Sequence, residues 1–179
     1  MFEVLQIGFF WLLQQLWRAL PLFVTLAMML VSMAPMNLMQ GVVLGPDLAL
    51  IAIFFWAIHG PEFLPPWAVF AVGLAQDFAT GSPVGFCAVM YLFAYGFTLS
   101  QRVFFRGRTG VGVWLGFAII AVLMAVGSWV LGTFVYARWL PPGELFGQAA
   151  VSVIFYPLLA RVLLLLRRAL TTAPETLRG

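Results

Sequence analysis

The sequence predicts an all-α membrane protein, a compact bundle of about six transmembrane helices of which two are short. Hydrophobic residues make up 64% of the 179 residues and charged residues only 8%, whereas a typical soluble domain has about 25% charged residues. Apolar stretches recur along the chain, separated by short loops that contain glycine and proline. At about 20 residues for each span, the length suits one bundle and leaves little room for a soluble domain.

The few polar residues exclude several classes of function. The net charge of +3 comes from scattered arginines, which is unlike the basic surface of a nucleic-acid-binding protein. The single histidine, His59, and the single cysteine, Cys87, share no catalytic or metal-binding spacing with the six carboxylates. We therefore expect a protein that is not an enzyme and holds no metal or cofactor, with Cys87 as a small packing residue.

Residues 1–18 form a segment of their own. On a helix, their glutamate, glutamine and arginine side chains fall on one half of the circumference, and leucines fill most of the other half. This pattern predicts an amphipathic interfacial helix, anchored by Trp11 and Trp17. The alternative is a simple extension of the first span.

A six-helix transmembrane domain is predicted for residues 19–168, followed by a short cytoplasmic tail, 169–179. Six apolar segments mark the spans, and they cover about 20–38, 48–58, 63–77, 84–99, 111–136 and 145–166. The second and third are short, because 11–15 residues cover only roughly 17–22 Å of the ~30 Å hydrocarbon layer. They either cross as short helices in a locally thinned bilayer or form a re-entrant hairpin. The hairpin would place His59 and Glu62 near the midplane, so we expect two short spans.

Arginine predicts the orientation. In a six-span topology, the amino end, the 59–62 turn, the 102–108 loop and the tail share one side, which collects most of the arginines. The positive-inside rule makes that side cytoplasmic, with both termini inside. The basic loop residues Arg102, Arg106 and Arg108 are candidate contacts for lipid or a partner. The pair Gly112 and Gly116 forms a GxxxG motif that allows close approach of another helix.

Two aspartates flank the short segments on the other, periplasmic side. Asp47 follows Pro46 and is well placed at a helix N-terminus. Asp77 ends the third segment, where a carboxylate is costly, at roughly 2.5–3.5 kcal/mol in a helix centre. Asp77 either caps the turn or accepts hydrogen bonds from the N–H groups that open the fourth span, or it belongs to a polar pocket or a docking point. Because the two segments are antiparallel, Asp47 and Asp77 should lie near each other.

A glycine- and proline-rich break follows Asp77. It contains Gly81, Pro83 and Gly85 within five residues. The glycines allow either a positive φ or close approach of helices. The pattern alone does not separate these two reasons.

Three motifs carry a family resemblance. They are Pro46-Asp47-Leu48, the run from Gly73 to Asp77, and Gly81-Ser-Pro-Val-Gly85 leading into a fourth segment with Tyr91 and Tyr95. Together with the size and the spacing of the spans, these motifs resemble MreD, the family of bacterial rod-shape-determining membrane proteins.

The resemblance implies a non-catalytic scaffold of the cell-elongation complex in the bacterial inner membrane. Such a protein would bind MreC and support lateral peptidoglycan synthesis and rod cell shape, with RodA and a class B penicillin-binding protein in the complex and MreB filaments on the cytoplasmic side. The family is also similar in fold to the substrate-binding subunits of energy-coupling-factor vitamin transporters. The alternative function is therefore such a subunit, with a polar pocket open to the periplasm. The candidate hydrogen-bonding residues for a ligand are Asn37, Gln40, Gln76, Thr80 and Ser82.

Overall fold

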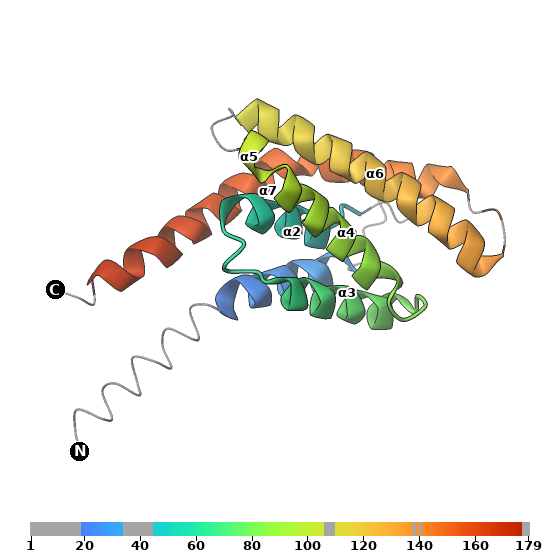
Figure 1. Cartoon of the computed structure of the whole chain (residues 1–179), viewed down its shortest axis with the longest axis horizontal. Coiled ribbons are helices and arrows are strands. Elements are labelled where there is room, and N and C mark those ends of the chain that lie inside the picture. The colour runs from blue at the N-terminus through green and yellow to red at the C-terminus, as the bar shows by residue number, and fades with distance from the viewer. Residues whose placement is uncertain (1–18, 34–44, 106–109, 138, 140, 177–179) are drawn as a thin grey trace, which may run out of the picture.

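The regular structure in the described part of the chain is entirely α-helical. The computed structural model describes residues 19–33, 45–105, 110–137, 139 and 141–176, with side chains as far as residue 169. After a first helix, Ala19–Ser32, the labelled helices are α2 (Leu48–His59), α3 (Pro66–Thr80), α4 (Phe86–Ser100), α5 (Arg102–Phe105), α6 (Gly110–Tyr136) and α7 (Pro142–Thr176) (Figure 1). The helix predicted for 1–18 lies outside these residues, as do Arg106 and Arg108.

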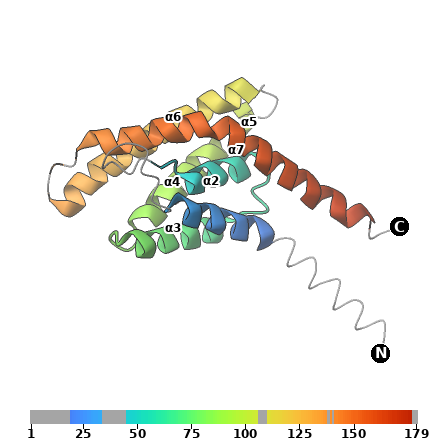
Figure 2. The same cartoon turned by 180° about the vertical axis from the view of Figure 1, so that it is seen from behind.

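Helix α2 is the centre of the bundle. Every residue from Leu48 to Ile58 is buried, because other helices surround this uniformly apolar segment. It packs against α4 and α7, and Figures 1 and 2 both show it between α3 on one side and the α6–α7 pair on the other. Its 12 residues cover about 18 Å. The short second segment is therefore a core helix, which hydropathy alone does not distinguish from a lipid-facing one.

Helices α3 and α4 form a tight antiparallel hairpin. The closest approach is at Gly73, where an added Cβ would collide with the backbone of Ala88 on α4. Helix α3 begins at Pro66, three residues after the predicted start, because proline suits the first helical turn and the preceding residues form a turn in which Phe63 N–H donates to Gly60 O. It ends at Thr80 rather than Asp77.

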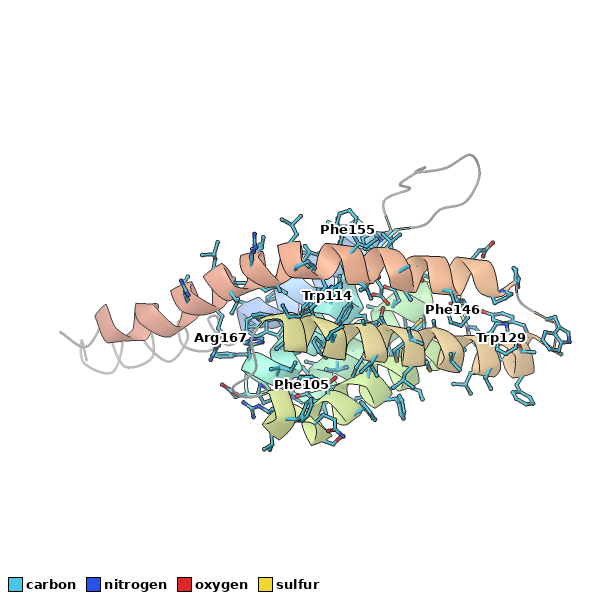
Figure 3. All side chains as sticks on the ribbon, turned by 90° about the horizontal axis from the view of Figure 1, so that it is seen from above. Phe105, Trp114, Trp129, Phe146, Phe155 and Arg167 are labelled. Carbon is cyan, nitrogen blue, oxygen red and sulfur yellow. The ribbon has the colours of Figure 1, made fainter. Side chains whose placement is uncertain are left out.

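Helices α6 and α7 form a second, longer pair. They lie side by side along most of α6 (Figure 1), and the Trp114 Nε1–H on α6 donates to the Val153 carbonyl on α7, at 2.9 Å (Figure 3). Both contain a stretch long and apolar enough to cross a membrane, Gly110–Tyr136 and Pro142–Ala169. Helix α7 continues to Thr176, ten residues beyond the predicted end of the sixth segment, and extends past the bundle.

His59 and Arg102 lie at the C-terminal end of α2. The His59 ring stacks on Phe55 with 4.3 Å between centroids, and its Nδ1 lies 3.0 Å from the Phe55 carbonyl. The Arg102 Nε–H donates to the Ile58 carbonyl at 3.1 Å. A cation at a helix C-terminus complements the helix dipole, so Arg102 has an internal structural role besides any contact with lipid or a partner.

Candidate functional site

Asp47 joins three helices at the start of α2. Its Oδ1 accepts a hydrogen bond from the Leu50 N–H at 2.9 Å, which makes it the N-cap of α2. Its own N–H donates to Ser152 Oγ on α7 at 2.7 Å. The Tyr91 hydroxyl on α4 donates to the same carboxylate, at 3.1 Å from Oδ1 and 3.2 Å from Oδ2. The start of the central helix is thus held by side chains of α4 and α7.

A serine from the first helix completes this arrangement. Ser32 Oγ donates to the Met28 carbonyl one turn earlier at 3.0 Å and accepts from the Leu48 N–H at 3.0 Å. Ser152 works in the same way, since its hydroxyl donates to the Gln148 carbonyl at 2.8 Å while it accepts from Asp47. N–H groups at a helix start have no partner within the helix, and here side chains from two other helices provide one.

The Asp77 carboxylate accepts hydrogen bonds at the start of α4. The residue is fully buried. Its Oδ2 accepts from the Gly85 N–H at 2.8 Å and its Oδ1 from the Cys87 N–H at 2.7 Å. Gly85 is the N-cap of α4 and Cys87 lies in its first turn, where N–H groups are otherwise unpaired. This geometry corresponds to the structural interpretation of Asp77 as an acceptor for the N–H groups that open the fourth helix.

The two glycines of the break adopt left-handed conformations. Gly81 has φ of 68° and Gly85 has φ of 97°, and a Cβ on either would meet nothing within 4 Å. Glycine is therefore needed at both positions for conformation, whereas Gly73 is needed for close packing. The N–H groups of Gly81 and Ser82 both donate to the Asp77 carbonyl, a common ending for a helix. Pro83 continues the turn, and its carbonyl accepts from the Phe86 N–H at 3.0 Å.

The glycine of the GxxxG motif packs against a ring. A Cβ on Gly116 would collide with the Phe105 ring of α5, so the close contact of this glycine is with an aromatic side chain. Phe105 lies at the same end of the bundle as Arg167 (Figure 3).

A cavity of about 270 Å³ opens beside Asp47. Its walls come from the start of α2, the end of α3, the first half of α4, the middle of α6 and the start of α7. The polar residues among those that line it are Asp47, Gln76, Thr80, Ser82, Cys87, Tyr91, Ser128, Gln148 and Ser152. Three of the five residues expected to meet a ligand, Gln76, Thr80 and Ser82, are therefore brought together here, while Asn37 and Gln40 lie outside the described residues.

Sequence reasoning missed several members of this wall. Tyr91 entered only as part of a family motif, and Ser128, Gln148 and Ser152 were not singled out. A signal was present, because Gln148 and Ser152 are four residues apart and share one face of an otherwise apolar helix. Polar side chains inside a membrane segment usually face a cavity or one another.

The cavity lies towards one end of the long helices. It is lined by residues 121–128, in the middle of α6, and by residues 145–152, at the end of α7 nearer the α6–α7 connection. Trp129 lies at that end, and Arg167 lies towards the other (Figure 3). The Trp129 ring packs on Trp139 with 5.5 Å between centroids. Under the orientation expected from arginine, this is the periplasmic half.

The described residues hold no group of three or more His, Cys, Asp or Glu side chains that could bind a metal ion. Comparison with curated proteins and with solved structures found no match. Comparison with protein families matches residues 13–168 to the model of rod shape-determining protein MreD. This match covers most of the chain and includes all three motifs around Asp47, Asp77 and the glycine break. The chain therefore belongs to the MreD family of rod shape-determining membrane proteins.

Proposed function

We propose that this protein is a non-catalytic integral membrane scaffold of the cell-elongation complex, which binds MreC and supports lateral peptidoglycan synthesis and rod cell shape. The observation that carries the proposal is the family match over residues 13–168. The proposed setting is the bacterial inner membrane, with several spans and both termini in the cytoplasm. RodA, a class B penicillin-binding protein and MreB filaments are the further partners proposed within the complex.

The surface of the bundle is compatible with a scaffold. Outward-facing apolar side chains run along α6, among them Val111, Leu115, Ile119, Val122 and Val126, which are 41–64% exposed. In a bilayer such a face contacts either lipid or the helix of another membrane protein. The two aspartates are used within the bundle: the Asp77 carboxylate accepts hydrogen bonds at the start of α4, and the Asp47 carboxylate accepts one at the start of α2. Their arrangement supports a rigid structural role.

The proposal is tested by tagging the full-length protein in its native membranes and purifying it in a mild detergent. Mass spectrometry of the recovered proteins should find an MreC-like protein in stoichiometric amount. Depletion of the protein should convert rod-shaped cells to round ones, and re-expression should restore the rods. Purification that recovers no MreC-like protein, together with cells that stay rod-shaped on depletion, would contradict the proposal.

A substrate-binding transporter subunit is the second candidate, and the cavity beside Asp47 favours it. This function requires a vitamin-sized ligand that stays bound and an ATPase module that co-purifies. The same purification distinguishes the two candidates, because small molecules can be identified by mass spectrometry from the same sample. A retained vitamin with an ATPase partner would favour the transporter subunit over the scaffold.

A further inference from the structure

The cavity beside Asp47 has the size of a small polar ligand. Its volume of about 270 Å³ is just below the roughly 300 Å³ at which small-molecule pockets begin. It would hold on the order of nine water molecules at ~30 Å³ each. Water molecules or a ligand in this space must form hydrogen bonds with the polar side chains that line it.

The walls of this cavity offer unused acceptors. Gln76 lines the cavity, and its side-chain oxygen, Oε1, is buried and has no hydrogen-bond partner among the residues that the structure describes. The Asp47 carboxylate has further lone pairs, since among the described residues its Oδ2 accepts from the Tyr91 hydroxyl, which is shared with Oδ1. A buried acceptor without a partner costs about 1–3 kcal/mol, so an occupant that donates hydrogen bonds is favoured.

Three hydroxyl donors of the same walls are directed elsewhere, while Gln76 and Gln148 also line the cavity and carry side-chain N–H₂ groups. The hydroxyls of Tyr91, Ser152 and Thr80 donate to Asp47, to the Gln148 carbonyl and to the Gln76 carbonyl, respectively. Among the described residues that line the cavity there is no arginine, lysine or histidine. An anion would therefore meet a carboxylate and no compensating cationic side chain from these residues, which disfavours phosphate and carboxylate ligands on electrostatic grounds.

We infer that this cavity binds a primary ammonium group, held by the Asp47 carboxylate and the Gln76 side-chain oxygen. An ammonium has three N–H donors and one positive charge, which matches one carboxylate and one unpaired amide oxygen. A quaternary ammonium has no donor and prefers a cage of aromatic rings, whereas the described residues contribute two aromatic side chains to this cavity, those of Phe86 and Tyr91. The proposal goes beyond the scaffold function and does not depend on it.

Two sources could supply the ammonium. One is a free soluble amine, and the other is the headgroup of an ethanolamine lipid. The shared chemistry is a primary ammonium on a short polar stem, and the experiments below separate the two sources.

Cys87 provides a reporter inside the cavity. It is the single cysteine of the chain, it is a free thiol, and it lines the cavity together with Asp47 and Gln76. The full-length protein would be purified in detergent and treated with two methanethiosulfonate reagents of similar size, one with an ammonium group and one with a sulfonate. Each rate at Cys87 is divided by the rate of the same reagent with a free small thiol.

The ammonium reagent should be favoured at Cys87 by about tenfold after this correction. Gln76→Leu should reduce the preference severalfold. Because the Gln76 side chain forms no hydrogen bond within the described residues, this substitution breaks none. Asp47→Asn should reduce the preference severalfold, although it also weakens the cap of α2, and the Asp77 carboxylate beside Cys87 accounts for the preference that remains. The matched control is Glu62→Gln, because Glu62 is exposed, lies outside the cavity and loses the same charge. Equal corrected rates in the wild-type protein would overturn the proposal.

Binding itself is measured by protection of Cys87. Ethanolamine at millimolar concentration should slow modification at least threefold, while ethylene glycol and glycolate, its neutral and anionic counterparts, should not. In lipid nanodiscs, phosphatidylethanolamine should protect Cys87 relative to phosphatidylcholine if the source is a lipid headgroup. Protection by free ethanolamine alone identifies a soluble amine. If neither amine protects, or if ethylene glycol protects equally well, the cavity holds water only and the proposal is wrong.

Discussion

The Tyr91 hydroxyl donates to both oxygens of the Asp47 carboxylate, at 3.1 and 3.2 Å, although the two residues are 44 positions apart. Tyr91 is buried on α4, and Asp47 begins the central helix α2. The contact therefore fixes the start of α2 relative to the α3–α4 hairpin. Because it also borders the cavity, it connects the stability of the bundle to the geometry of the proposed ammonium site.

Tyr91→Phe should destabilise the bundle by about 1.5–3 kcal/mol, because it removes a hydrogen bond to a carboxylate and changes little else in shape. The measurement is the midpoint of thermal unfolding in detergent. Tyr156→Phe is the matched control: Tyr156 is equally buried and stacks on Phe117, but its hydroxyl forms no hydrogen bond within the described part of the chain. Equal losses for the two variants would show that the contact with Asp47 contributes nothing.

Asp77→Ala should lower the yield of folded protein much more than Glu62→Ala. Without the carboxylate, the N–H groups of Gly85 and Cys87 lose their acceptor, at a cost of about 1–3 kcal/mol each. Glu62 is exposed in the turn between α2 and α3, and its loss should cost little. The comparison uses the monodisperse fraction after size-exclusion chromatography. Equal fractions for both variants would contradict the capping role of Asp77.

Three of the glycines of the hairpin should respond differently to substitution. Gly73→Ala should be the most damaging because its Cβ meets the backbone of Ala88, which cannot move without separating α3 from α4. Gly85→Ala should cost only about 1–2 kcal/mol, for a left-handed conformation with open space around it. Gly96→Ala is the control, since this helical glycine also has open space and alanine favours helix. Thermal unfolding should rank Gly73→Ala lowest and Gly96→Ala at or above the wild type.

The extent of α2 could be predicted from the sequence, but its position could not. The apolar run of 48–58 matches Leu48–His59 closely. An all-round apolar helix is typical both of a lipid-exposed span and of a buried core, so only the packing against α4 and α7 shows that α2 is internal. The end of α7 differs for another reason. Hydropathy marks where apolar residues stop, near 166, whereas the helix continues to Thr176. The two arginines, the alanine and the leucine that follow are good helix formers, but the threonines and the proline beyond them are not, and nothing in the sequence explains the last turn.

The local roles of Asp47 and Asp77 could be predicted from the sequence, but the contacts between helices that complete the candidate site could not. Asp47 as a helix start, and Asp77 beside free N–H groups, follow from local rules about caps and turns. The hydrogen bonds from Tyr91 and to Ser152 do not follow from local rules, because they depend on the rotation and depth of α4 and α7 against α2. The cavity depends on the same register of separate helices. Its polar lining was therefore anticipated only at Gln76, Thr80 and Ser82, which lie next to the break.

The orientation is open to a direct test with two engineered cysteines. In a Cys87→Ser background, Glu62→Cys places a thiol in the exposed turn between α2 and α3, and Trp139→Cys places one in the α6–α7 connection, where the side chain is 80% exposed. The distribution of arginine predicts that position 62 faces the cytoplasm and position 139 the periplasm. In intact cells, a membrane-impermeant maleimide should label position 139 only, and disruption of the membrane should expose position 62. A cytoplasmic control protein that stays unlabelled shows that the membranes are intact. With that control, labelling of position 62 in intact cells would contradict the predicted arrangement of the two short segments. If the control protein is labelled as well, the membranes are leaky.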